Sequence, residues 1–139
     1  MDRSQAIARI TRFIPRIITN EHNEMPTKPI SMNEVEEVVQ QMALGKAPGP
    51  DGFTTNFFHL FWDLIKEEVL EMVEESRRNR RVLKAFNATF ITLIPKGEGA
   101  DTPGEFRLIS LCNAIYKIIT KVIANRLKLL LPNLISPKK

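Results

Sequence analysis

Two short β-prone runs on either side of a Gly/Pro-rich loop are the feature that most constrains how this 139-residue chain folds. The runs at 88–96 and 105–111 are rich in β-branched and other apolar residues, and the segment 97–104 between them contains three glycines and a proline. This pattern predicts an antiparallel β-hairpin over about residues 88–111. Lys96 ends the first strand and Arg107 opens the second, so the hairpin could bring two cations together, as a phosphate clamp would.

Helical spacing of apolar residues predicts the structure of the part that precedes the hairpin. The pattern at residues 4–14 predicts a first helix, and the polar segment 19–29 predicts a linker after it. Ser31 and Glu34 form a capping-box sequence, which predicts a helix that ends at Gly45.

Two longer amphipathic segments complete the predicted secondary structure. Thr54 or Thr55 could cap a helical stretch that divides into two helices near Trp62 and Asp63. A last helix follows the hairpin and is expected to end at Pro132. Its apolar positions are Ile115, Ile118, Ile119, Val122, Ile123, Leu127 and Leu130, and its polar face carries Lys117, Lys121, Arg126 and Lys128. The predicted fold is therefore α+β, mostly α, with one antiparallel β-hairpin.

Composition excludes several classes of protein and site. Hydrophobic residues make up 43% of the chain and no apolar run is long enough to cross a bilayer, so no membrane partner is expected. The single cysteine, Cys112, excludes an internal disulfide. Neither Cys112 nor the two histidines, His22 and His59, show metal-ligand spacing.

Charge is divided unevenly along the chain. Residues 1–76 carry 7 basic and 13 acidic side chains, whereas residues 77–139 carry 13 basic and 3 acidic ones. A C-terminal half this basic indicates a polyanionic partner such as nucleic acid, although a solvated basic surface would have the same composition. The densest basic run comprises Arg77, Arg78, Arg80 and Arg81. It is open to two interpretations, as the capped end of a helix or as a contact to a nucleic-acid backbone.

Several motifs follow one another in a recognisable order. Two prolines and two glycines within residues 46–52 predict a rigid, exposed turn. The motifs are Lys46-Ala47-Pro48-Gly49-Pro50-Asp51-Gly52-Phe53, Phe57-Phe58 with Phe61-Trp62, Leu93-Ile94-Pro95-Lys96, Phe106-Arg107-Leu108-Ile109-Ser110-Leu111-Cys112-Asn113, and Tyr116-Lys117 with Ala124-Asn125-Arg126-Leu127. Together they resemble the N-terminal, fingers part of a reverse transcriptase from a non-LTR (LINE-type) retrotransposon, in particular the plant-like branch. The resemblance implies an N-terminal helix and linker at 1–30 and a partial reverse transcriptase domain at 31–139, without palm and thumb.

The resemblance also implies roles for individual residues. Lys96 and Arg107 match positions at which the family binds the triphosphate of the incoming deoxynucleotide, and an arginine fork with a lysine point charge suits that ligand. Lys46 matches a motif near the template strand, which makes it a candidate contact to a nucleic-acid backbone. The implied partners are an RNA template, a DNA primer and a deoxynucleotide triphosphate. The chain departs from the family at Leu108, where proline is usual.

The residues for catalysis are not found in the sequence. Nucleotidyl transfer needs two metal ions held by aspartates, and the chain has four aspartates: Asp2, Asp51, Asp63 and Asp101. No acidic residue follows Glu105, where the family places its palm. We therefore expect no catalytic or metal-binding residues and no cofactor here, with Mg²⁺ needed only by a complete family enzyme. Two alternatives remain, a nucleic-acid-binding module and a non-functional retroelement relic.

Overall fold

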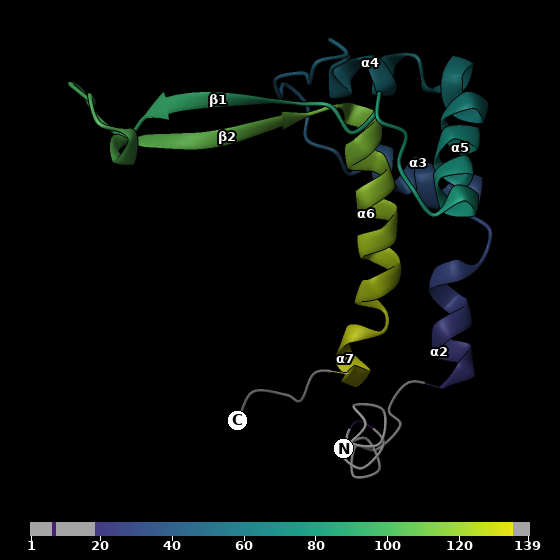
Figure 1. The fold of residues 1–139 in the computed structure, drawn as a ribbon. Coiled ribbons are helices and arrows are strands. Elements are labelled where there is room, and N and C mark those ends of the chain that lie inside the picture. The colour runs from purple at the N-terminus through teal and green to yellow at the C-terminus, as the bar shows by residue number, and fades with distance from the viewer. Residues whose placement is uncertain (1–6, 8–18, 135–139) are drawn as a thin grey trace. The chain divides into compact units, whose positions relative to one another are not determined.

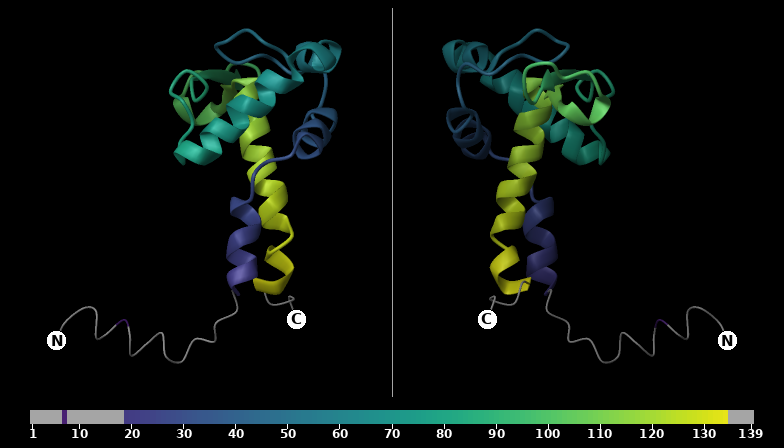
Figure 2. Two further views of the ribbon diagram at one scale, coloured as in Figure 1. Left: turned by 90° about the vertical axis from the view of Figure 1, so that its right-hand side faces the viewer. Right: turned by 90° about the vertical axis from the view of Figure 1, so that its left-hand side faces the viewer.

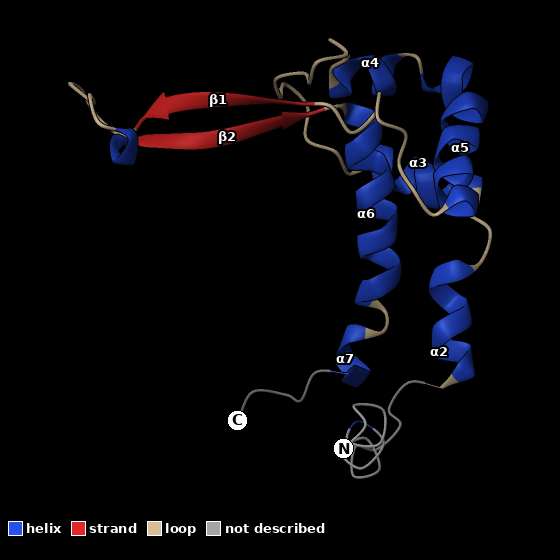
Figure 3. Cartoon of the chain, in the orientation of Figure 1, coloured by secondary structure: helices blue, strands red, loops and turns tan. Residues whose placement is uncertain are grey.

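The structure, a computed structural model, describes Ile7 and residues 19–134. These residues are mostly helical and contain one two-stranded antiparallel sheet, which confirms the predicted mixed fold (Figures 1 and 3). The elements, in chain order, are α2 (Asn20–Glu24), the 3₁₀ helix η1 (Met25–Thr27), α3 (Met32–Gln40), α4 (Thr55–Leu60), α5 (Trp62–Asn79), β1 (Thr89–Pro95), the 3₁₀ helix η2 (Pro103–Glu105), β2 (Phe106–Cys112), α6 (Ala114–Lys128) and α7 (Leu131–Leu134).

The chain forms two compact units. The larger one spans residues 29–124 and holds α3, α4, α5, the hairpin and most of α6. The smaller one combines residues 1–28 with 125–139. The division into 1–30 and 31–139 that the sequence suggested stays a prediction.

Helix α3 begins at the predicted capping box. The Glu34 amide donates to the Ser31 hydroxyl at 3.4 Å, and the Ser31 amide donates to the Glu34 carboxylate at 2.9 Å. The predicted end at Gly45 is wrong, because the helix tightens after Gln40 into an i→i+3 bond from the Met42 amide. Gly45 instead takes a positive φ of 69° in the following turn, where its amide donates to the Asn56 side chain.

The predicted division of the next helical stretch is confirmed. Helices α4 and α5 meet at Phe61, whose ψ of 15° interrupts the regular helix. Thr54 is the residue that precedes α4, but its side chain makes no capping bond. Helix α5 ends at Asn79, and the next residue, Arg80, adopts the left-handed conformation with φ 53°.

The core of the larger unit is built from one face of each long helix. The sequence places apolar residues at helical spacing, so each helix buries one stripe. The buried core residues are Val35, Val38 and Val39 of α3, Phe58 of α4, Trp62, Val69 and Val73 of α5, and Ala114, Ile115, Ile118, Ile119 and Val122 of α6. These side chains hold the start of α6 against α3 and α5.

One buried amide joins three separate segments at the junction of β2 and α6. Asn113 is 2% exposed, and its side-chain oxygen accepts a bond from the Asp51 amide at 3.2 Å. Its side-chain nitrogen donates to the Ala85 carbonyl at 3.0 Å. Gly49 packs so closely that a Cβ at this position would lie 2.5 Å from the Asn113 amide nitrogen. We call these residues, Gly49, Asp51, Ala85 and Asn113, the Asn113 clasp.

The hairpin forms where the sequence predicts it. Strands β1 and β2 pair from Thr89 opposite Cys112 to Pro95 opposite Phe106. Every residue of β1 is exposed, and the strands leave the helices at the N-terminal end of α6 (Figure 1). The hairpin is therefore connected to the core at its root, and its strand faces are open to solvent.

Helix α6 differs from its prediction at the C-terminal end. It ends at Lys128, and Pro132 lies inside the short helix α7 instead of ending the preceding helix. Ile123 and Leu127, predicted on the apolar face, are exposed. Arg126, predicted on the polar face, is buried because its guanidinium donates to the carbonyls of two residues of the smaller unit, Pro26 and Lys28.

The smaller unit corrects the prediction of a linker at 19–29. Helices α2 and η1 occupy most of this segment, and Figure 2 shows α2 next to the C-terminal end of α6. The bonds from Arg126 to the end of η1 supply the tertiary contact that helical spacing could not reveal. The helix predicted at 4–14 lies outside the described residues, apart from Ile7. None of the helices between residues 19 and 134 is long and apolar enough to span a membrane.

The clasp predicts that two glycine substitutions differ in their effect on the free energy of unfolding. Gly49→Ala should lower the free energy of unfolding by about 1–3 kcal/mol, because the new methyl group would overlap the Asn113 backbone. Gly97→Ala is the matched control, since nothing lies within 4 Å of a Cβ built there. Urea unfolding followed by circular dichroism measures both. Equal stability of the two variants would contradict the close packing at Gly49.

Candidate nucleotide and nucleic-acid interface

The strand register places the two predicted triphosphate ligands on one face of the hairpin. Ile94 lies opposite Arg107, and Lys96 follows Ile94 by two residues, so its side chain projects from the same face. The Lys96 amide donates to the Glu105 carbonyl at 2.8 Å, which continues the register past Pro95. Lys96 and Arg107 are thus diagonal neighbours, a relation in which Cα atoms lie about 7–8 Å apart.

Neither cation is neutralised by a neighbouring carboxylate in the described part of the chain. Both residues are exposed, and the two ion pairs found among the described residues involve neither of them. The Lys96 ammonium donates to the Gly104 carbonyl at 2.7 Å, which orients the side chain over the tip without cancelling its charge. The two side chains can therefore offer both positive charges to one anion.

The carboxylate of Glu105, which immediately precedes β2, is held by the tip of the hairpin. Glu105 accepts bonds from the amides of Asp101 and Thr102 and from the Thr102 hydroxyl, at 3.1, 2.9 and 2.8 Å. The bond from the Thr102 amide is the main cause that lowers the pKa of Glu105 to about 2. The Glu105 carboxylate therefore orders the loop through these hydrogen bonds. The same loop holds the Gly104 carbonyl within hydrogen-bond distance of the Lys96 ammonium.

The opposite face of the hairpin has no charged residue. Cross-strand pairs place Ile91 with Ser110, Leu93 with Leu108, and Pro95 with Phe106 on this face. Leu108 is 74% exposed and Ile91 69% exposed. Exposed apolar side chains lie on both faces, since Phe90 on the face of the two cations is 55% exposed, but the opposite face is the one without a charge.

The structure separates the four arginines of the basic run. Arg77 forms a bidentate pair with Glu74, with Nε 2.8 Å from the carboxylate, so its charge is already engaged. Arg80 and Arg81 are exposed beyond the end of α5. Arg78 is exposed as well, but it lines an acidic groove. The i,i+3 spacing of Glu74 and Arg77 on one helix permits this pair, but spacing alone does not say which of the neighbouring arginines and carboxylates will form it.

Lys46 lies on a loop whose position is fixed by the clasp. The loop turns at Gly52, which has a φ of 76° and donates to the Gly49 carbonyl. Asp51 is held at both its amide, by Asn113, and its carboxylate, which accepts from the Phe53 amide at 3.1 Å. Lys46 is exposed at the start of this loop. The turn predicted for residues 46–52 is confirmed, but it is not exposed throughout, because Gly49 is buried against Asn113.

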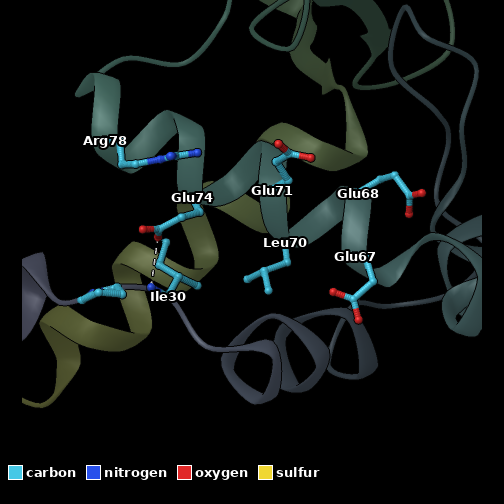
Figure 4. A pocket seen from close by; sticks show the side chains of 8 residues that line it. Ile30, Glu67, Glu68, Leu70, Glu71, Glu74 and Arg78 are labelled. Atoms are coloured by element: carbon cyan, nitrogen blue, oxygen red, sulfur yellow. Dashed lines mark hydrogen bonds between the residues drawn. The ribbon is translucent and has the colours of Figure 1, made fainter.

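An acidic groove on α5 marks a surface unsuited to a nucleic-acid backbone. Its volume is about 500 Å³, and Figure 4 shows Glu74 and Arg78 at one end with Glu67 and Glu68 at the other. Glu71 and the apolar residues Ile30 and Leu70 complete the groove with Pro29. Phosphates would be repelled here.

The described residues do not fit a catalytic metal centre. No group of three or more His, Cys, Asp or Glu side chains between residues 19 and 134 is arranged to hold a metal ion. The carboxylates that are tightly held, Glu74 and Glu105, serve an arginine and a loop. We assign no metal-dependent step to these described residues.

Sequence reasoning missed the role of Asn113 in positioning the hairpin. An asparagine between a strand and a helix resembles an ordinary N-cap. Here its side chain instead reaches Ala85 and Asp51, 28 and 62 residues away in the sequence. The one signal in the sequence is the glycine at position 49, which permits a close approach of another segment. A glycine in a proline-rich turn is also explained by the turn itself.

Comparison with curated proteins finds similarity to products of transposable elements. The chain is 28% identical over 121 residues to the transposon TX1 uncharacterized 149 kDa protein of Xenopus laevis, an alignment of 87% of this chain and 9% of that protein. It is 29% identical over 105 residues to the retrovirus-related Pol polyprotein from the type-1 retrotransposable element R2 of Bradysia coprophila, covering 76% of this chain and 12% of the polyprotein. The chain thus spans about a tenth of the length of these relatives. No protein-family model matches it.

The Glu74–Arg77 pair predicts a stability change at acidic pH. The bond from Arg77, with a further one from the Ile30 amide, lowers the pKa of Glu74 from its ordinary 4.5 to about 2. Ionised Glu74 therefore stabilises the fold above about pH 4.5, and this contribution is lost as the pH falls towards 2. Glu74→Gln should lower the free energy of unfolding at pH 7 by about 1–2 kcal/mol and flatten its dependence on pH in this window.

Glu71→Gln is the matched control for this substitution. Glu71 lies on the same groove but makes no hydrogen bond or ion pair with the described residues. Urea unfolding of both variants between pH 2 and 7 measures the effect. If both variants keep the parental pH dependence, the pair does not stabilise the fold.

Proposed function

We propose that this chain is the fingers part of the reverse transcriptase of a non-LTR retrotransposon and that its hairpin binds the triphosphate of a deoxynucleotide. The observation that carries the proposal is the placement of Lys96 and Arg107, exposed and unneutralised, on one face of the hairpin. The similarity to an R2 Pol polyprotein and to a TX1 protein supports the retrotransposon origin. It agrees with the motif order in the sequence.

The chemistry of the two cations suits a triphosphate. An arginine guanidinium offers two parallel N–H donors to one phosphate, whereas a lysine ammonium acts as a mobile point charge. Mounted on neighbouring strands, the two groups would contact adjacent phosphates without reorganising the backbone. Arg107 would grip one phosphate and Lys96 would neutralise the next.

In this proposal the chain binds the triphosphate, and other parts of a longer protein carry out catalysis. The described carboxylates form no metal site, so the metal-dependent transfer of a nucleotide is not assigned to them. The uncharged face of the hairpin would pack against such a further part, which would shield Leu93 and Leu108 from water. RNA template and DNA primer would then be the nucleic-acid partners.

Substitution of the two cations should weaken triphosphate binding selectively. Lys96→Ala and Arg107→Ala should each raise the Kd for dTTP about tenfold or more, because each removes a charge-assisted hydrogen bond. Arg107→Lys should bind less tightly than the parent, since lysine lacks the planar fork. Chemical-shift titration of the hairpin amides with dTTP, and with thymidine as the phosphate-free control, measures these changes.

Lys84→Ala is the charge-matched control, because Lys84 is exposed and lies outside the hairpin. It should bind dTTP like the parent. A loss of affinity in Lys84→Ala equal to that in Arg107→Ala would show only general attraction of anions. Equal shifts with thymidine and dTTP would remove the triphosphate from the proposal.

A nucleic-acid-binding module is the second candidate function, and the exposed end of α5 favours it. Arg80 and Arg81 lie side by side in the sequence, are exposed, and form no ion pair with any described residue. An RNA–DNA duplex should bind with an affinity that falls steeply with salt. The double variant Arg80→Ala/Arg81→Ala should reduce the slope of log K against log salt by about 1.5–2.

Lys66→Ala provides the control for this measurement. Lys66 is paired with Asp63 on the acidic helix, so its loss should leave the slope unchanged. Fluorescence anisotropy of a labelled duplex between 50 and 200 mM salt, as a rough working range, measures the slope. A slope near zero in the parent chain would exclude phosphate contacts altogether.

A further inference from the structure

A cavity of about 350 Å³ lies beside the clasp in the larger unit. It is formed by side chains from the loop before α4, both of the helices α4 and α5, the segment after α5, and the start of α6. Its lining residues are Asp51, Phe53, Phe57, Phe58, Ile65, Glu68, Val69, Met72, Ala85, Phe86, Asn113 and Ile115. This volume falls within the range of about 300–1,000 Å³ that is usual for small-molecule sites.

The walls of the cavity are apolar and largely aromatic. Phe53 and Phe57 lie with their ring centroids 4.7 Å apart, and Phe57 meets Phe58 edge-on at 5.6 Å. Phe53 is 47% exposed. An aromatic side chain that stays exposed beside an apolar cavity can cover a ligand that enters it, and the open face of its ring attracts cations.

Charge at the cavity has one sign. Asp51 and Glu68 are the charged residues of the lining, and both are exposed carboxylates. Asp51 is held in place through the bond from the Phe53 amide to its carboxylate. Neither carboxylate is paired with a lysine or arginine in the described part of the chain. The lining therefore combines aromatic rings with uncompensated negative charge.

We propose that this cavity binds a small organic cation with an apolar body, of the arylalkylammonium class. The aryl group would occupy the space among Phe57, Ile65 and Met72, where its burial removes apolar surface from water. The ammonium group would remain at the rim, between the carboxylates of Asp51 and Glu68 and over the ring of Phe53. A neutral or anionic ligand of the same shape would lack the attraction to the carboxylates and to the Phe53 ring.

The cavity shares no residue with the proposed triphosphate site, and its occupation has a separate readout. Asp51 and Asn113 belong to the cavity and to the clasp, so a ligand would contact the residues that join the hairpin to the core. A ligand that binds only the folded chain raises its melting temperature, by an amount that grows with the logarithm of the ligand concentration once this exceeds the Kd. Binding can thus be followed without any nucleotide or nucleic acid.

Phenethylammonium and its neutral counterpart 2-phenylethanol test the proposal. We expect saturable binding of phenethylammonium in the millimolar range, a rise in melting temperature, and weaker binding of 2-phenylethanol. Glu68→Gln should weaken the binding of phenethylammonium roughly three- to tenfold and leave that of 2-phenylethanol unchanged. Glu71→Gln is the matched control, because Glu68 and Glu71 both line the acidic groove on α5 but only Glu68 also lines the cavity. Isothermal titration calorimetry at low salt measures all four combinations.

A cavity-filling variant separates the site from general surface binding. Ala85→Phe would place a ring at the rim while its backbone carbonyl remains available to Asn113, so it should abolish binding and preserve a cooperative melt. Equal affinity for the amine and the alcohol, equal effects of Glu68→Gln and Glu71→Gln, or undiminished binding by a folded Ala85→Phe would each overturn the proposal. Absence of saturable binding in the parent chain would also overturn it.

Discussion

The hydrogen bonds of Asn113 are the constraint on which the arrangement of the larger unit depends. Its amide is buried and satisfies the backbone of two segments that are distant in the sequence, the loop at Asp51 and the segment at Ala85. An apolar replacement would remove the side-chain partners of the Asp51 amide and the Ala85 carbonyl, and both of these hydrogen bonds are partly buried. Because Asn113 directly follows β2 and precedes α6, these bonds also fix the point at which the hairpin leaves the core.

The attachment of the hairpin at Asn113 is important for its stability, because the strands gain little from tertiary packing. A two-stranded hairpin is marginal in water when it stands alone, and here all of β1 is exposed. Local devices compensate in part, through the cross-strand register and through the capping of the tip loop by Glu105. The two faces then differ in kind, since one offers the cations Lys96 and Arg107 and the other offers only apolar and uncharged side chains. Such a division suits a hairpin that contacts a charged ligand on one side and protein on the other.

The features that the sequence predicted correctly are those with local causes. The capping box at Ser31, the break between α4 and α5, and the hairpin each depend on residues within a few positions of one another. The sequence predicted the hairpin but not its register, and a shift of one residue in the pairing would place Lys96 and Arg107 on opposite faces. The hairpin that carries Lys96 and Arg107 was therefore predictable, whereas the roles of these two residues stay predictions.

The features that could not be predicted depend on contacts between distant residues. Arg126 fits the polar pattern of α6, and only the carbonyls of Pro26 and Lys28 make its burial favourable. The same carbonyls belong to a segment that composition marks as a linker, so both errors have one cause. The clasp is a further example, since neither Gly49 nor Ala85 shows in its own neighbourhood that it will meet Asn113.

Coupling between the two proposed ligands would follow from the residues that the cavity shares with the clasp. Asp51 and Asn113 contribute to both, so a ligand in the cavity that favours the clasped arrangement must be bound more tightly when the clasp is intact. The reciprocal holds for the hairpin, whose root is ordered by the same bonds. A triphosphate that favours the ordered hairpin at Lys96 and Arg107 and a cation in the cavity would then assist each other, although their sites share no residue. The coupling free energy cannot exceed the difference in each ligand's affinity for the chain with and without the clasp. It is zero if the clasp is fully formed in the absence of both ligands.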